Sequence, residues 1–530
     1  MSCTIYIAWL VSLVCLTSGH TIQTKLGTVV GKEDENCIQY LGIPYAKPPV
    51  RWRPPQQLDS FPNEPLEATS WAPMCYQGPC TLLTPGCSQK VSEDCLYLNI
   101  YTPKMNGTDE SKMAVLLYIH GGSFAFLSAM SDLYYGGNIA KLGGIIVVTF
   151  NYRLNVFGGL VTGNDDSAAT GNYGIMDQKM AIEWVYDNIG DYGGDREMIT
   201  LVGQSAGAQS VLLHLTAEKV TDMFAQVVIQ SAAVSVPFRT YEGALSQGQM
   251  FADSLGCDVN DINCMRNKSA REVFQASMSA HVTSTSSFLV HFEEWSPVVD
   301  GDEVSDNLYS EFVEQEHFSQ KPAIVGTVAD EGLIFVRVAM QNPVTIGEYY
   351  IMLWRLKAEN DLIVYSKYSV PQAQFADTRS VITSVVTDFG FICPMRSIAR
   401  KLQEYQNVWK YSFEHAIGAN GFWGPVKSCE NRVCHGADIP ILFQTLDRTE
   451  FPMSEDERDL SNSFINYIAN FIKTGNPNSD LSKNITQWPI YNNTVTENKE
   501  IVFKVPELKI IKDYKVDECD LWDSIAPYEA

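Results

Sequence analysis

The feature of this sequence that most constrains its fold is a series of uninterrupted apolar runs rich in β-branched residues. Runs of this kind, bounded by glycine or asparagine, are typical of strands that are buried on both faces. Four of them lie in the first half of the chain, at residues 114–119, 145–150, 199–202 and 227–229. Helical patterns separate them, the clearest at residues 177–188. This alternation predicts an α/β fold with a large, mostly parallel central sheet flanked by helices on both faces.

The rest of the chain fits the same organisation. Further strands are expected at residues 27–30, 38–41, 323–325 and 408–413. Hydrophobic residues make up 45% of the 530 positions, which is enough to bury a large core and excludes intrinsic disorder. The sequence contains no internal repeat and no domain linker. We therefore expect residues 20–530 to form a single domain.

The first 19 residues have the pattern of a secretory signal peptide. Residues 5–16 are almost entirely apolar and are followed by the small-residue stretch 17–19, although no Lys or Arg precedes them. The alternative is a membrane anchor, but the run is shorter than the ~20 residues that a spanning helix needs. No later segment is expected to span a bilayer, so stable membrane insertion is not expected. The sequence predicts a protein that is secreted or resides in the lumen of the secretory pathway.

Cysteine usage agrees with export, because exported proteins form disulfides. Of 13 cysteines, Cys3 and Cys15 lie in the predicted signal, which leaves 11. Sequence does not fix their connectivity, and the candidate pairs are Cys80–Cys87, Cys257–Cys264, Cys429–Cys434, Cys75–Cys95 and Cys393–Cys519, with Cys37 left over. A zinc site at Cys429, Cys434 and His435 is the alternative, but no second ligand pair accompanies it, so no metal or cofactor is expected. Glycosylation sequons occur at Asn106, Asn267, Asn484 and Asn492.

The net charge limits the possible partners. Asp and Glu number 62 against 38 Lys and Arg, which gives a formal charge of -24. A surface of this charge repels phosphates, so nucleic acids and anionic membranes are poor candidate partners. Neutral and cationic small molecules remain open as substrates. The oligomeric state does not follow from the sequence.

A candidate nucleophile lies in the segment Gly203-Gln204-Ser205-Ala206-Gly207, which has the pattern G-x-S-x-G. The segment follows the expected strand at residues 199–202 and precedes a helical run at 208–215. A sharp turn from strand to helix projects the serine hydroxyl above the sheet, and its glycines let the chain double back closely. The Ala206 amide, at the start of the helix, would then face a reacting carbonyl. The alternative is an ordinary buried turn serine.

A serine needs a base to remove its proton and an acid to orient that base. In folds with this elbow the chain order is serine, acid, histidine. Glu331, directly after the end of an expected strand, is the acid candidate, and Asp330 is its rival. Two histidines follow Glu331 in the sequence. We favour His435, in a loop beside a cysteine pair, over His415, which ends an expected strand.

A second group of oxyanion donors is expected after the strand at residues 114–119. The next residues are His120-Gly121-Gly122-Ser123-Phe124. Small residues let backbone N–H groups approach a substrate oxygen, and each such donor is worth roughly 10²–10³ in rate. The alternative is that the two adjacent glycines only form a turn.

Taken together, these residues resemble the type-B carboxylesterase/cholinesterase family of α/β-hydrolases, over nearly the whole chain after the signal. The matching stretches include YLGIPYA at 40–46, SEDCLYLN at 92–99, NYR at 151–153, PVVDG at 297–301 and CHG at 434–436. The resemblance implies an α/β-hydrolase fold and a serine carboxylesterase that acts on small-molecule esters. It implies the catalytic residues Ser205, Glu331 and His435, with oxyanion donors at the amides of Gly122, Ser123 and Ala206. It also implies the disulfides Cys75–Cys95, Cys257–Cys264 and Cys393–Cys519.

The sequence departs from the family at three positions. Many members have a glycine in place of Ser123 and a glutamate in place of Gln204. Cholinesterases have a tryptophan that binds quaternary ammonium ten residues before the cysteine of the SEDCLYLN stretch, where this chain has Pro85. A choline specialist is therefore not expected. A lipase and a non-catalytic adhesion protein of the same fold are the alternatives to an esterase.

Overall fold

The structure is a computed structural model. It describes residues 20–79, 90–104, 111–281, 291–356, 361–481, 485–492, 498–525 and 528. The predicted signal segment, the Cys80–Cys87 pair, Pro85 and the sequons at Asn106 and Asn484 lie outside the described residues.

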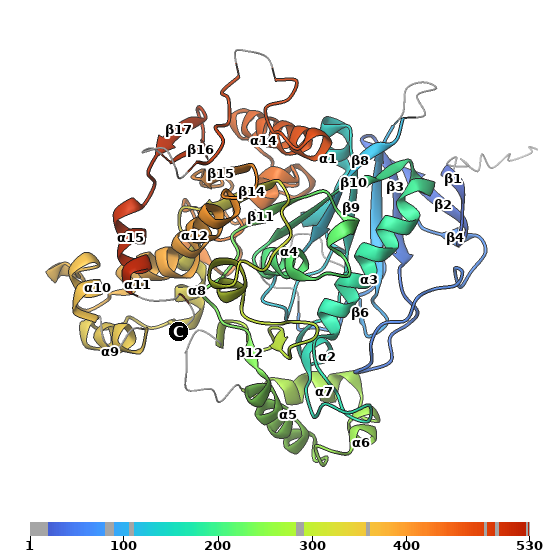
Figure 1. The fold of residues 1–530 in the computed structure, drawn as a ribbon, viewed down its shortest axis with the longest axis horizontal. Coiled ribbons are helices and arrows are strands. Elements are labelled where there is room, and N and C mark those ends of the chain that lie inside the picture. The colour runs from blue at the N-terminus through green and yellow to red at the C-terminus, as the bar shows by residue number, and fades with distance from the viewer. Residues whose placement is uncertain are drawn as a thin grey trace, which may run out of the picture.

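One large sheet runs through the molecule (Figure 1). Its strands, in spatial order, are β1 (His20–Thr24), β2 (Gly27–Glu33), β3 (Cys37–Pro44), β7 (Tyr97–Pro103), β9 (Ile146–Phe150), β8 (Met113–Ile119), β10 (Gly194–Gln204), β11 (Gln226–Gln230), β14 (Ala323–Val328), β15 (Val408–Phe413), β16 (Lys499–Phe503) and β17 (Lys509–Lys512), and β4 (Leu66–Glu67) pairs with β2. Neighbours from β9 to β16 pair in parallel. The other neighbours along this order pair antiparallel, and β4 pairs with β2 in parallel. The predicted parallel sheet with flanking helices is confirmed for the centre, and the whole sheet is mixed.

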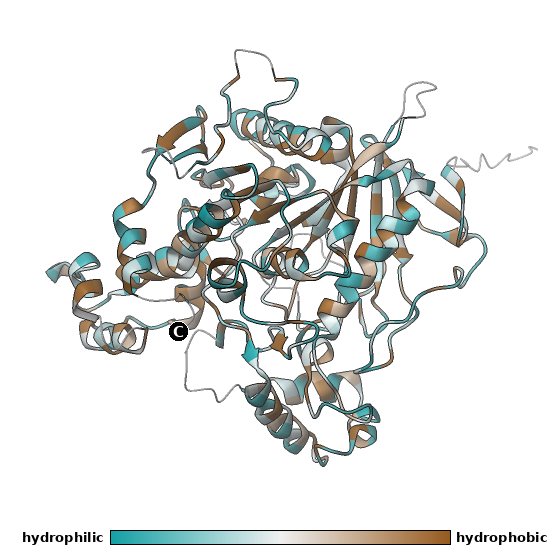
Figure 2. Cartoon of the chain, in the orientation of Figure 1, coloured by the Kyte–Doolittle hydropathy of each residue, from teal (hydrophilic) through white to brown (hydrophobic). Residues whose placement is uncertain are grey.

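Helices cover both faces of the sheet, which explains the uninterrupted apolar runs. Along β8, Leu117 packs in one core layer with the helices α3 (Tyr173–Asn188) and α4 (Ala206–Thr216). The neighbouring Leu116 packs in the opposite layer, with α1 (Gly137–Gly143) and α14 (Glu455–Thr474). Successive side chains of a strand point to opposite faces, so a strand covered on both sides has no polar face. Figure 2 shows the central strands largely brown and the helices mixed brown and teal.

The remaining elements are shorter or lie around the central layers. The helices are α2 (Asn155–Gly159), α5 (Tyr241–Leu255), α6 (Ile262–Arg266), α7 (Ala270–Ser277), α8 (Glu331–Ala339), α9 (Ile346–Leu356), α10 (Asp361–Lys367), α11 (Arg379–Thr387), α12 (Cys393–Leu402), α13 (Ile439–Leu442) and α15 (Val516–Ile525). The short strands β5 (Met74–Cys75) and β6 (Val91–Ser92) form one pair, and β12 (Arg239–Thr240) and β13 (Val298–Val299) form another.

One helical segment corrects the expectation that no later stretch is long and apolar enough to span a bilayer. Arg379–Leu402 meets that criterion by length and composition. It consists of α11, the π-helical turn Asp388–Ile392 and α12, and most of it is buried inside the molecule. Burial of this kind is what a core helix of a folded domain shows, and it accounts for the apolar composition.

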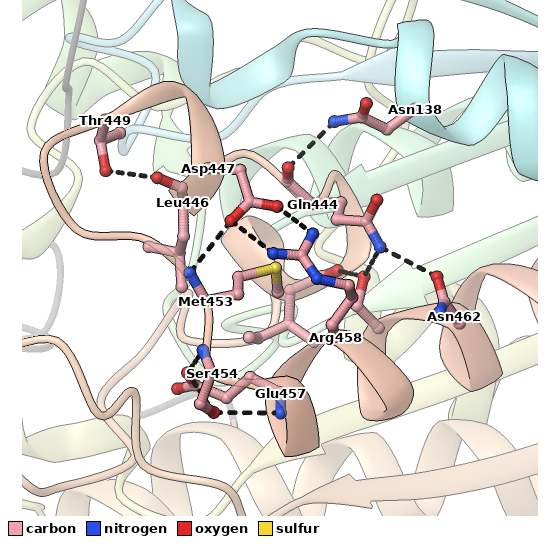
Figure 3. Close-up of polar contacts among 12 residues, drawn as sticks. Asn138, Gln444, Leu446, Asp447, Thr449, Met453, Ser454, Glu457, Arg458 and Asn462 are labelled. Atoms are coloured by element: carbon pink, nitrogen blue, oxygen red, sulfur yellow. Dashed lines mark hydrogen bonds and ion pairs between the residues drawn. The ribbon is translucent and has the colours of Figure 1, made fainter. Parts of the chain in front are cut away.

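A polar network holds the start of α14, the long helix on one face of the sheet (Figure 3). The Ser454 hydroxyl accepts a hydrogen bond from the Glu457 amide at 3.2 Å, and Glu457 Oε2 accepts one from the Ser454 amide at 2.9 Å. This reciprocal capping box satisfies two amides that a helix start leaves unpaired. Asp447 pairs with Arg458 and also accepts a hydrogen bond from the Met453 amide at 3.1 Å. The network therefore fixes the entry of the chain into α14.

Four disulfides occur within the described residues. They are Cys75–Cys95, Cys257–Cys264, Cys393–Cys519 and Cys429–Cys434. Cys37 is buried and unpaired in the described part of the chain. Because Cys429 and Cys434 bond to each other, the alternative zinc site at these cysteines has no thiolate ligands.

Candidate active site

β10 and α4 are joined at the carboxyl end of the central strands (Figure 1). Ser205 forms the sharp turn between them. Its backbone has φ 59° and ψ −127°, and its amide donates to the Gln230 carbonyl at 2.9 Å. A Cβ on Gly203 would lie 2.2 Å from the Gly207 carbonyl oxygen, and one on Gly207 would lie 2.1 Å from the Ile119 carbonyl oxygen. Only glycine fits at both positions, so the motif residues are required by the geometry of this turn.

Glu331 and His435 form a direct pair. Glu331 is the first residue of α8 and is fully buried. Its Oε2 lies 2.5 Å from His435 Nδ1, and its Oε1 accepts a hydrogen bond from the Val328 amide at 2.9 Å. A carboxylate at Nδ1 holds the proton on that nitrogen, which leaves a lone pair on Nε2. The imidazole can therefore act as a base at Nε2.

The loop that carries His435 is held on several sides. The Cys429–Cys434 disulfide closes it, and the Asp330 amide donates to the Val433 carbonyl at 3.0 Å. The imidazole lies beside the stacked rings of Phe335 and Phe391, with centroid distances of 5.0 and 5.1 Å. Packing of this kind restricts the ring to one orientation, which a proton acceptor at a fixed position requires.

The rival acid and the rival base have other partners. Asp330 forms an ion pair with Arg432 and accepts a hydrogen bond from the Val433 amide. His415 Nε2 lies 3.2 Å from Oε1 of Glu457, in the capping box of α14. Neither side chain lines the cavity that contains Ser205 and His435. Their positions favour Glu331 and His435 over Asp330 and His415.

Ser205 and His435 open into one cavity of about 520 Å³, a size that suits a small organic ligand. Its wall is largely apolar and consists of Gly122, Ser123, Phe126, Leu127, Gln204, Ser205, His291, Phe292, Ile334, Phe335, Val338, Ala339, Met340, His435 and Gly436. Phe126, Leu127, His291 and Phe292 also line a neighbouring cavity of about 390 Å³. The two hollows therefore adjoin each other along this shared wall.

The loop after β8 lies against the elbow. Gly122 has φ +99° and Ser123 has φ 52°, and the amides of Ala125 and Phe126 both donate to the Gly122 carbonyl. A Cβ on Gly121 would lie 2.9 Å from the Ser205 Cβ, so this loop could not approach so closely with a larger residue. Gly122 and Ser123 line the cavity, and Ala206 is buried at the first position of α4. The first amides of a helix have no acceptor within the helix and are available to an anion.

Gln204 is a site residue whose contact was not predicted from the sequence. Its Nε2 lies 2.9 Å from His435 Nε2. Within the part of the chain that the structure describes, the Ser205 hydroxyl makes no hydrogen bond. One signal for this position was present in the sequence, its departure from the glutamate that many members of the resembled family have there. That comparison indicated a lost charge but not a contact with the histidine.

Asp438 is a second buried carboxyl group near the pair. It accepts hydrogen bonds from Tyr411 Oη at 2.8 Å and from Gln230 Nε2 at 3.0 Å. Burial raises the pKa of Asp438 to about 6, and the nearby Glu331 contributes in the same direction. Asp438 was not predicted as a site residue, although it lies only three positions after His435.

Comparison with known proteins relates the whole chain to ester hydrolases. The model of the carboxylesterase family matches residues 18–522. The cAMP-regulated D2 protein of Dictyostelium discoideum is 33% identical, over 92% of this chain and 89% of its own length. An acetylcholinesterase of Bungarus fasciatus is 28% identical, over 98% of this chain and 90% of its own length. The solved structure of a PNB esterase superposes with a TM-score of 0.78 at 27% identity, over 94% of this chain and 99% of that one.

Proposed function

This chain belongs to the carboxylesterase family and has the α/β-hydrolase fold, and from that premise we propose that it hydrolyses carboxylic esters through an acyl-enzyme on Ser205. The observation that carries the proposal is the pair of Glu331 and His435, 2.5 Å apart, with the imidazole opening into the same cavity as Ser205. Three residues of the types that serve as acid, base and nucleophile thus come from separate stretches of chain, one pair in direct contact and Ser205 and His435 lining one cavity.

In the proposed reaction, His435 Nε2 takes the proton of the Ser205 hydroxyl as its oxygen attacks the ester carbonyl. Glu331 stabilises the imidazolium that forms and keeps the ring in place. The imidazolium then gives the proton to the departing alcohol. Water hydrolyses the acyl-enzyme with the same base, and the serine is restored.

The negative oxygen of the tetrahedral intermediate needs donors that are already in place. We assign this role to the backbone amides of Gly122, Ser123 and Ala206. The positions of these residues support the assignment, because the loop after β8 lies against Ser205 and Ala206 is the first residue of α4. A backbone donor is independent of the side chain, so Ser123 in place of glycine is compatible with the role.

The cavity wall supports small-molecule esters with apolar groups as substrates. The side chains facing the ligand are mostly aliphatic and aromatic, and among the described lining residues there is no Lys or Arg that would bind an anionic group. Burial of apolar substrate surface would then supply most of the binding energy. A lipase acting on lipid esters is the second candidate, favoured by the same apolar lining and by the exposure of Val338 at the wall.

A fluorophosphonate probe tests the proposal directly. The wild-type protein should be labelled stoichiometrically, and Ser205→Ala should not be labelled. Wild-type protein that folds but takes up no probe would favour a non-catalytic member of the family. A jump in rate above the solubility limit of a short-chain triglyceride would assign a lipase, and a rate that simply saturates with soluble esters would assign an esterase.

Export is part of the proposal. The disulfides of the described chain suit an oxidising compartment, and Asn267, in one of the four sequons, is exposed. We propose that residues 1–19 are removed and that residues 20–530 form one secreted or lumenal domain. Sequencing the N-terminus of the protein from a eukaryotic host, together with its mass before and after glycosidase treatment, tests cleavage and glycosylation.

A further inference from the structure

The side chain of Gln204 contacts the nitrogen that catalysis requires to be free. With Glu331 at Nδ1, the lone pair of His435 is on Nε2, and the Gln204 amide donates to it at 2.9 Å. In the proposed reaction that same lone pair accepts the proton of Ser205. His435 Nε2 therefore has two competing donors, the Gln204 amide and the Ser205 hydroxyl, which are neighbours in the chain.

We propose that Gln204 is a positioning residue that holds His435 Nε2 in the resting enzyme and yields it to Ser205 when the ester binds. This inference rests on the proposed function, and it adds that Gln204 limits how often the lone pair of His435 Nε2 is free to accept the Ser205 proton. In this proposal Gln204, which also lines the cavity, acts through the histidine.

The surroundings keep the amide in this place. Gln204 is 4% exposed, and its backbone is the last residue of β10, paired in register with Gln230 of β11. Its side-chain oxygen lies 3.1 Å from the position that a Cβ of Gly121 would take, and its nitrogen lies 3.8 Å from that of Gly436. Two glycine loops thus enclose the amide, so its side chain has little freedom to leave without a ligand-induced change.

An amide suits this role better than a carboxylate, because it has a donor and an acceptor. It can donate to the neutral imidazole, and after a rotation of the amide group it can accept from the imidazolium. A carboxylate at the same position can only accept, and its charge favours the protonated ring.

The other titratable groups that face the imidazole are Glu331 and Asp438, and His291 lines the same cavity. The amide therefore adds no charge to a site that already has two acids.

Two variants test the inference. For Gln204→Glu, we expect the acid limb of the kcat/KM profile on p-nitrophenyl acetate to move up by about one pH unit or more, because a carboxylate next to an imidazole favours its protonated form. For Gln204→Met, similar in shape but without donors, we expect fluorophosphonate labelling at neutral pH to be roughly two- to tenfold faster, the usual worth of one hydrogen bond. Gln444→Met is the matched control, since that amide donates to Asn462 (Figure 3) and to Ser461, and Gln444 does not line the cavity.

The outcomes separate this inference from the proposed function. No labelling of the wild type would refute the proposed function itself. Normal labelling of the wild type, with an unshifted acid limb in Gln204→Glu, would overturn only the role of Gln204. Slower labelling of Gln204→Met than of wild type and control would also overturn it, because it would make the amide a support for the base. If Gln204→Glu fails to fold, the labelling rate of Gln204→Met decides.

Discussion

Replacing Glu331 by glutamine tests the acid of the site with almost no change in shape. Both carboxylate oxygens accept from N–H groups, Oε2 from His435 Nδ1 at 2.5 Å and Oε1 from the Val328 amide at 2.9 Å. A glutamine has one acceptor oxygen and one NH₂ donor. If its oxygen faces Val328, its NH₂ faces His435, so the imidazole must carry its proton on Nε2 and can no longer accept one from Ser205. If its oxygen faces His435, two buried donors meet at Val328.

The size of the effect follows from these two arrangements. Leaving a buried donor unsatisfied costs about 1–3 kcal/mol, so the amide is expected to turn its oxygen to Val328 and force the inactive tautomer. A wrong tautomer at such a base, together with the lost charge, lowers kcat by roughly 10³–10⁴. That corresponds to about 4–5 kcal/mol of transition-state stabilisation. The fold should survive, since volume and packing are preserved.

The assay is kcat on p-nitrophenyl acetate, with the thermal midpoint as a check on folding. Asp330→Asn is the matched control, because Asp330 is the adjacent carboxylate and is bound to Arg432. We expect the control to retain activity within a few-fold. A Glu331→Gln protein with more than a tenth of wild-type kcat would refute the assignment, and a large loss in Asp330→Asn would transfer the role to Asp330.

Two further predictions concern the fold around the site. For Gly207→Ala, the new Cβ would lie 2.1 Å from the Ile119 carbonyl oxygen, so the turn at Ser205 must shift. We expect kcat to fall at least ~10²-fold and the free energy of unfolding to drop by about 1–3 kcal/mol. A variant with wild-type kcat would contradict this prediction. For Glu457, burial raises the pKa, but hydrogen bonds from His415, Gly418 and Ser454 outweigh it and lower the pKa from 4.5 to about 2. The lowered pKa contributes up to about 3 kcal/mol to the free energy of unfolding, which is complete above pH 4.5 and is lost as the pH falls toward 2. In urea unfolding, the difference in free energy between wild type and Glu457→Gln should therefore narrow from pH 6 to pH 3. A gap that stays constant with pH would refute this reading.

Parts of the fold could be predicted because their cause is local. A strand buried on both faces needs an uninterrupted apolar run, and residues 114–119 and 199–202 fall inside β8 and β10. β7 was not predicted, although it lies between β3 and β9 in the sheet. Its Asn99 breaks the apolar pattern, but the side chain is fully buried because it bonds to the Gly42 amide and the Ala129 carbonyl. Partners from distant parts of the chain made this polar residue compatible with a strand.

The candidate site shows the same limit. Ser205, Glu331 and His435 could be named because a local motif and a known chain order restrict the choices. The contact of Gln204 with His435 joins residues 231 positions apart, and no local pattern reports it. The same holds for the two phenyl rings beside the imidazole, which come from α8 and from the π-helical turn before α12.

The proposed reacting groups and the cavity wall come from different parts of the chain. Ser205 directly follows β10 and Glu331 lies three positions after the end of β14, and backbone hydrogen bonds set the alignment of these strands. A large part of the wall comes instead from the later turns of α8, from Met340 just after it and from residues 291 and 292. Natural variation or directed evolution can therefore reshape which ester fits, through exchanges at Val338, Met340 or Phe292, without rebuilding the hydrolytic chemistry.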